Sequence, residues 1–300
     1  MTKDGESLDW RGLPIKRPYP WEIDVTVCIA APCLEGKGSR IVVCADRKAS
    51  SALGSAESTL KMRALPSGWH ALVSGNESDI EALIRHFRNQ FGTLPGFEEI
   101  DACIKQALFA RKRELAEEYV QSRFAITYAE FYATGKERLP ADVFHNAIQG
   151  ISTIDLGAEL IICGFISGFP EIYHCDRRGK ATAASDFSVI GEGEYLAAAS
   201  LLRREQHHME SLGHTLYNVF EAKRYAQAVG SVGAKTLLAV LEDGKKSHFC
   251  AIGIHEQLDA YLNQYGPKET PQTFGFNGPL YHEQKEQAQT IISETDREKA

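Results

Sequence analysis

The chain has 300 residues, 43% apolar and 24% charged, which is enough to bury a substantial core and excludes fibrous, collagen-like and largely disordered classes. Its 33 basic and 40 acidic side chains give a formal net charge of −7, with an isoelectric point near 5.8. Such a surface repels phosphate backbones, and the sequence contains no local basic patch, so we expect no nucleic-acid partner.

Residues 1–25 form a polar stretch interrupted by Pro14, Pro18 and Pro20, without the apolar segment of a secretion signal. Nowhere does the chain have 18 consecutive apolar residues that could cross a bilayer. The seven cysteines are odd in number, widely spread and without a CxxC pair, a pattern typical of reduced thiols in the cytoplasm. We therefore expect a cytoplasmic protein with no membrane partner, whose residues 1–25 are an extension or a propeptide.

After residue 25 the pattern alternates between blocks of strands and blocks of helices. Strands are predicted over 25–31, 41–45 and 69–74, helices over 80–87 and most of 97–133, strands over 159–166, 171–175 and 181–190, helices over 194–206 and 213–228, and strands over 236–241 and 248–254. Such blocks favour an α+β fold, with helices layered on largely antiparallel sheets. We expect residues 26–255 to form one domain and the polar, proline-containing residues 256–300 to form a tail of low order.

Several short segments resemble the proteasome-like N-terminal-nucleophile (Ntn) hydrolases. They are residues 26–31, 41–47, 61, 74–79, 191–193 and 230–233. The likeness runs from about Thr26 to His255 and is nearest to the bacterial proteasome-related proteins of the Anbu type, whose mature chains begin with threonine directly after the initiator methionine. It implies the Ntn hydrolase fold, a four-layer αββα sandwich of antiparallel sheets, and assembly into a ring-like homo-oligomer.

The resemblance also implies a catalytic arrangement. Thr26, at the head of the first strand, would be the nucleophile, with its own freed α-amine as the base. Lys61 would be a buried cation that lowers the pKa of the hydroxyl, and Asp46 would orient that lysine. The backbone N–H of Gly75 would face the oxyanion. Ser231 matches a serine that hydrogen-bonds near the nucleophile.

Each of these residues also has an ordinary interpretation. Thr26 can be one more strand residue, Asp46 a strand-end residue and Lys61 a surface charge, while Gly75 suits a strand-to-helix turn. Ser231 equally suits a loop before the last hairpin.

Two positions depart from the pattern of proteasome β-type subunits. Ala228 stands where they carry an aspartate, and Glu192 where they carry a serine between two glycines. Glu192 could replace the missing carboxylate beside the nucleophile, or be a solvated loop charge, which we favour slightly.

The leading prediction is a threonine-type amidohydrolase or peptidase, in which Thr26 attacks a peptide or small-amide carbonyl after the Val25–Thr26 bond has been cleaved. The alternatives are a non-catalytic proteasome-like ring or scaffold subunit, and a different enzyme that uses the same nucleophile on a small amide. No cofactor or metal is expected, since the pair His207–His208 has no third ligand in view.

Overall fold

The computed structural model describes residues 26–36, 38–51, 54–56, 59–92, 99–245 and 247–266. In chain order the strands are β1 (Cys28–Glu35), β2 (Gly38–Asp46), β3 (Ala49–Ser51), β4 (Gly54–Ala56), β5 (Met62–Ala64), β6 (His70–Gly75), β7 (Ala158–Ile166), β8 (Phe169–Cys175), β9 (Ala181–Ala183), β10 (Ser188–Ile190), β11 (Thr236–Glu242) and β12 (His248–Phe249). The helices are η1 (Pro66–Gly68, a short 3-10 turn), α1 (Glu77–Phe91), α2 (Ile100–Phe124), α3 (Tyr128–Arg138), α4 (Ala141–Ser152), α5 (Glu194–Arg203), α6 (Leu212–Ala226) and α7 (Ile252–Tyr265).

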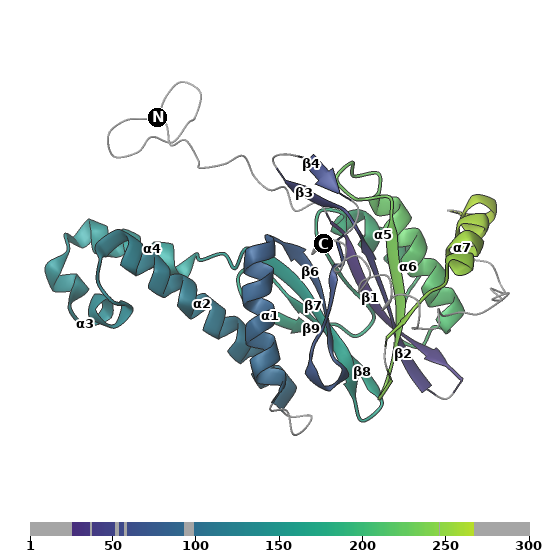
Figure 1. The fold of residues 1–300 in the computed structure, drawn as a ribbon, viewed down its shortest axis with the longest axis horizontal. Helices are drawn as coiled ribbons and strands as arrows, with labels where there is room; N and C mark the ends of the chain where they lie inside the picture. Colours follow the sequence, from purple (N-terminus) through teal and green to yellow (C-terminus); the bar gives the residue numbers. More distant parts are fainter. Residues whose placement is uncertain are drawn as a thin grey trace, which may run out of the picture.

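Within the described residues the strands form two five-stranded antiparallel sheets and one short hairpin (Figure 1). The first sheet has the order β10-β1-β2-β11-β12 and the second has the order β5-β6-β7-β8-β9, whereas β3 pairs with β4. In the first sheet Cys28 lies opposite Ala45, and Asp46 lies opposite Thr236. The prediction of a mixed α+β fold with antiparallel sheets and helices is therefore confirmed.

The outer face of each sheet packs against helices. On the first sheet, Ile29 belongs to the same apolar cluster as Tyr217 of α6. On the second sheet, Val73 belongs to a cluster that also contains Phe87 of α1 and Ile104 of α2. The helix blocks of the sequence thus supply the two outer coverings, because each sheet face must bury its apolar side chains against another element.

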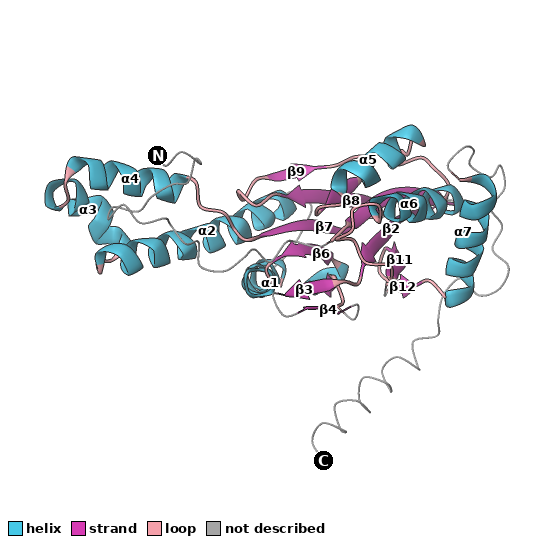
Figure 2. Ribbon diagram, turned by 90° about the horizontal axis from the view of Figure 1, so that it is seen from above, coloured by secondary structure: helices cyan, strands magenta, loops and turns pink. Residues whose placement is uncertain are grey.

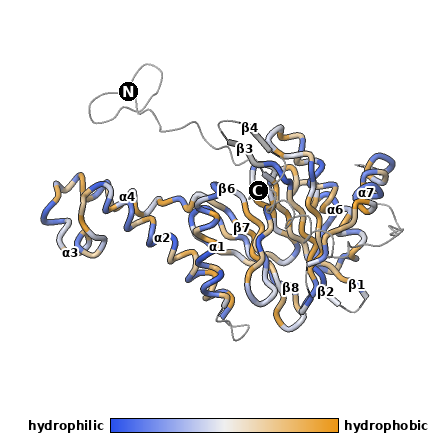
Figure 3. Tube along the Cα trace, viewed as in Figure 1, coloured by the Kyte–Doolittle hydropathy of each residue, from blue (hydrophilic) through white to orange (hydrophobic). Residues whose placement is uncertain are grey.

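The inner faces of the two sheets pack against each other. Cys28 and Val43 of the first sheet share a buried cluster with Leu72 and Ile161 of the second. Successive strand residues point to opposite faces, so a strand that is covered on both faces is apolar at nearly every position. This explains why β1, β2 and β7 appear in the sequence as continuous apolar runs, which Figure 3 shows along the strands.

A helical arm, made of the C-terminal half of α2 with α3 and α4, projects from the sheets (Figures 1 and 2). The arm has a small core of its own, centred on Val120, Phe131 and Ala147. The sequence predicted a long helical tract over 97–133 with one or two breaks in it. The tract breaks after Phe124, where Ala125 adopts a left-handed backbone with φ of 55°, and α3 begins at a capping box of Thr127 and Glu130.

The predicted strand over 181–190 is divided between the two sheets. Its first part, β9, is an edge strand of the second sheet, and its last part, β10, is an edge strand of the first. Ser188 of β10 lies opposite Ala30 of β1, and Thr182 of β9 lies opposite His174 of β8. The chain therefore crosses from one sheet to the other within a segment that reads as one strand.

The C-terminal end of the domain also differs from the sequence prediction. Only His248–Phe249 of the predicted strand over 248–254 forms a strand, and α7 begins at Ile252. The predicted boundary at 255 falls inside this helix, whose Ile254 and Leu258 are buried in the core beside α6. Two apolar residues four positions apart lie on one helical face, so the chain stays ordered beyond the expected boundary.

The predicted extension, residues 1–25, and residues 267–300 of the predicted tail lie outside the described residues. Across the part that the structure describes, no helix combines the length and the apolar character needed to cross a bilayer.

Candidate active site

The carboxylate of Asp46, the last residue of β2, is fully buried and is held by backbone amides. The N–H of Val27 donates to its Oδ1 at 3.1 Å. The N–H groups of Lys48 and Gly233 donate to its Oδ2 at 3.2 and 2.9 Å. Amide donors of this kind compensate a buried negative charge, and they come from the segments that meet at one end of β1, β2 and β11. The position of Asp46 is therefore determined by three separate segments.

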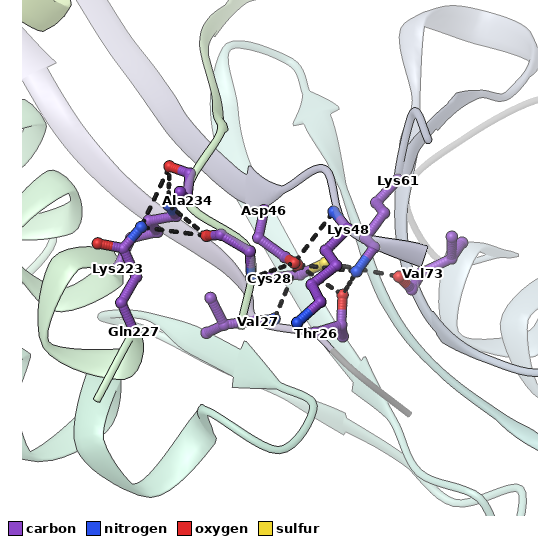
Figure 4. Close-up of polar contacts among 11 residues, drawn as sticks. Thr26, Val27, Cys28, Asp46, Lys48, Lys61, Val73, Lys223, Gln227 and Ala234 are labelled. Carbon is purple, nitrogen blue, oxygen red and sulfur yellow. Dashed lines mark hydrogen bonds and ion pairs between the residues drawn. The ribbon is translucent and has the colours of Figure 1, made fainter. Parts of the chain in front are cut away.

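Two side chains meet the remaining side of this carboxylate. The hydroxyl of Thr26 donates to Asp46 Oδ1 at 2.8 Å, and the Nζ of Lys61 donates to the same oxygen at 2.8 Å. Lys61 Nζ also contacts the Oγ1 of Thr26 (Figure 4). Thr26, Asp46 and Lys61 are 2%, 0% and 6% exposed. The structure thus brings together three residues that the sequence places 20 and 35 positions apart.

The segment 191–193 packs directly on Thr26. The N–H of Gly193 donates to the carbonyl of Thr26 at 3.2 Å. Gly191 has φ of +94°, and a Cβ there would lie 2.4 Å from Thr26 Cγ2, so only glycine fits. Between the two glycines, Glu192 is exposed to solvent. That placement agrees with a solvated loop charge, the interpretation that the sequence favoured slightly.

The loop that contains Ser231 contacts Asp46 through a different residue. Ser231 is half-buried, and its Oγ has no hydrogen-bond partner within the described residues. Gly233, two residues later, supplies the amide that reaches Asp46. Ala228, at the position where the resemblance expects an aspartate, is exposed.

Lys223 of α6 supports this loop and was missed in the sequence. Its side chain is fully buried, and Nζ donates to the carbonyls of Gly233 and Ala234 at 2.8 Å each. Gln227 donates to the same two carbonyls at 3.1 Å (Figure 4). The sequence around Lys223 gave no clear signal, because α6 also carries His214, Asn218, Glu221 and Arg224, and a buried lysine is recognised only when its partners are known.

Gly75 lies at the end of β6 on the same side of the molecule. Two residues before it, Val73 donates its N–H to the carbonyl of Lys61 at 3.0 Å. Gly75 has φ of +130°, and a Cβ would lie 2.4 Å from the carbonyl oxygen of Gly157, so this position also requires glycine. Within the described residues no hydrogen bond links Gly75 to Thr26. Its role as an oxyanion donor stays a prediction.

The thiol nearest to the site is chemically inactive. Burial raises the pKa of Cys28 to about 12, Lys61 works in the opposite direction, and Asp46 adds to the rise. The thiol therefore stays protonated at neutral pH and is a poor nucleophile. Elsewhere, His208 pairs with Asp186 at 2.9 Å on the surface, and the described residues contain no group of three or more potential ligands that could hold a metal ion.

No family model matches the chain, and no curated protein matches it. The geometry of Thr26, Asp46 and Lys61 indicates which chemistry the site can perform. A hydroxyl in contact with a buried ammonium group experiences a field that favours its alkoxide form, and the paired carboxylate holds that ammonium group in place. Such an arrangement supports nucleophilic attack on a carbonyl when a base removes the hydroxyl proton.

Proposed function

We propose that the protein is a threonine-type Ntn amidohydrolase or peptidase of the proteasome-like class, with Thr26 as its nucleophile. The observation that carries the proposal is the buried three-way contact among Thr26 Oγ1, Lys61 Nζ and Asp46 Oδ1. The two antiparallel sheets, packed face to face with helices on their outer faces, are consistent with the four-layer αββα Ntn hydrolase fold.

The proposed reaction begins once the Val25–Thr26 bond has been cleaved, because an amide nitrogen cannot act as a base. The freed α-amine, with a pKa of about 8, accepts the hydroxyl proton while Oγ1 bonds to the carbonyl carbon of the substrate. The C–N bond then breaks, and the proton leaves with the departing amine. Water hydrolyses the ester formed on Thr26. Lys61 stabilises the developing negative charge on Oγ1, and the N–H of Gly75 is proposed to stabilise the oxyanion.

The proposal also covers the substrate, the location in the cell and the assembly of the protein. A peptide or small-amide substrate follows from the chemistry of the nucleophile. All seven cysteines are buried and unpaired, which supports the proposal of a cytoplasmic protein. Assembly into a ring-like homo-oligomer rests on the sequence resemblance alone.

Intact-mass spectrometry tests the central step. We expect wild-type preparations to contain chains that begin at Thr26, and Thr26→Ala preparations to contain only full-length chains. Thr59→Ala, a nearby threonine whose recorded hydrogen bond is through its backbone, is the matched control and should process normally. Periodate oxidises an N-terminal 1,2-amino alcohol, so chains that begin at Thr26 should lose mass on periodate treatment. An unprocessed chain that has lost Met1 begins at Thr2 and should react as well, and its larger intact mass distinguishes it.

A non-catalytic ring or scaffold subunit is the second candidate. The exposed Ala228 favours it, because this position offers no carboxylate to the site. Only full-length wild-type chains, at every stage of assembly, would support this candidate and contradict the first.

A further inference from the structure

A cavity of about 420 Å³ lies between the edge strands of the two sheets and the start of α5. This volume is in the range of small-ligand sites. Figure 2 shows β9 and α5 along the same side of the molecule. The lining residues are His174, Asp176, Lys180, Thr182, Ala183, Ala184, Phe187, Ser188, Val189, Glu194 and Ala198.

The cavity adjoins the candidate nucleophile through the backbone. Gly193 donates its N–H to the carbonyl of Thr26 at 3.2 Å. Glu194, which lines the cavity, follows Gly193 by one Cα–Cα step of about 3.8 Å. The loop that bonds to the carbonyl of Thr26 therefore leads directly into the wall of the cavity.

Among its lining residues the cavity has two carboxylates, those of Glu194 and Asp176, against one ammonium group, that of Lys180. Glu194 is half-buried, and within the described residues it has no ion-pair partner. Burial raises its pKa, repulsion from the nearby Glu159 raises it further, and His174 works in the opposite direction. Glu159 also has no ion-pair partner within the described residues. It lies on β7 opposite Ser74, the residue before Gly75. Lys180 provides positive charge at the exposed rim.

Ser188 supplies an independent sign of a missing ligand. It is 4% exposed, and its Oγ has no hydrogen-bond partner within the described residues. In β10 it lies opposite Ala30, a member of the cluster between the sheets, so its side chain points to that inner space and lines the cavity. A buried unpaired hydroxyl is rare in folded proteins, because it forgoes the hydrogen bonds that water would give it.

We propose that this cavity is a subsite for the basic side chain, lysine or arginine, of a substrate residue near the scissile bond. The inference rests on the proposed function. The walls formed by Phe187, Ala184 and Ala198 suit the aliphatic stem of such a side chain. The carboxylate of Glu194 and the hydroxyl of Ser188 accept hydrogen bonds from its charged end.

Binding tests the subsite without requiring turnover. The protein is the full chain carrying Thr26→Ala, and the probes are N-acetyl-lysine methylamide and its norleucine analogue, which keeps the stem and lacks the ammonium group. Affinities are measured by ligand-observed NMR titration. We expect the lysine probe to bind about tenfold more tightly than the norleucine probe.

Four further substitutions in the Thr26→Ala protein measure how much each side chain contributes to binding of the lysine probe. Glu194→Gln should reduce the lysine preference to about threefold or less, and Ser188→Ala should weaken the lysine probe about threefold. Lys180→Gln, which removes positive charge from the rim, should strengthen the preference about twofold. Glu118→Gln, an exposed carboxylate on the arm, has the same charge change and should leave it unchanged.

Equal affinity for the two probes, or an unchanged preference in Glu194→Gln, would overturn the subsite. Lysine-selective binding that depends on Glu194, in a protein whose wild type never yields chains beginning at Thr26, would support the cavity as a cation site and count against the proposed function. The two ideas can therefore fail separately.

Discussion

Replacing Lys61 with methionine removes the cation at the candidate nucleophile and keeps most of the side-chain volume. Lys61 Nζ lies 2.8 Å from Asp46 Oδ1, and the lysine and aspartate side chains are 8% and 0% exposed. Removing one member of a buried ion pair costs about 3–5 kcal/mol. Three backbone amides still compensate the Asp46 carboxylate, so we expect a loss near the lower limit, about 3 kcal/mol in the free energy of unfolding.

Lys48→Met is the matched control for this substitution. Lys48 also contacts Asp46, but through its backbone N–H, which methionine retains, and its Nζ reaches only the carbonyl of Gly230 near the surface. The control should change the free energy of unfolding by less than about 0.5 kcal/mol.

The assay is urea denaturation of both variants at one protein concentration, because any self-association would make the midpoint depend on concentration. A difference between the two variants below about 1 kcal/mol would refute the assignment of Lys61 as a buried partner of Asp46. If the proposed function is correct, Lys61→Met should also stop the appearance of chains that begin at Thr26.

Two further predictions follow from the packing and the burial. Gly191→Ala would place a Cβ 2.4 Å from Thr26 Cγ2 at φ of +94°, whereas a Cβ at Gly230 meets no atom within 4 Å. We expect Gly191→Ala to lower the free energy of unfolding by about 1–3 kcal/mol and Gly230→Ala to change it little. Equal denaturation midpoints for the two variants would contradict this. Burial raises the pKa values of Cys28, Cys44 and Cys163 from 9.0 to about 12. As the pH rises, the unfolded chain loses these protons before the folded chain does. The free energy of unfolding should therefore be highest below pH 9 and fall between about pH 9 and pH 12. A constant free energy of unfolding from pH 7 to pH 11 would rule the effect out.

The secondary structure was predictable where local pattern and burial agree. Residues 41–45 and 160–163 are apolar at successive positions because both faces of these strands are covered. The hairpin signal at 242–245 matches the connection between β11 and β12. The division of residues 181–190 between two sheets had no local signal, because it depends on which sheet edge is available. The continuation of α7 beyond residue 255 was missed because its few apolar residues are diluted by polar ones.

The amino-acid sequence alone indicated an α+β fold, since strand and helix periodicity are local properties of the chain, and its resemblance to the proteasome-like Ntn hydrolases pointed to Thr26, Asp46 and Lys61. Only the tertiary structure shows that Gly233, 187 positions from Asp46, donates to its carboxylate, and that Lys223 supports that loop. It also shows that Glu194, which follows the glycine bonded to the Thr26 carbonyl, lines a cavity. A buried charge or hydroxyl is defined by what surrounds it, and those surroundings come from distant segments that are brought together when the two sheets and their helices pack.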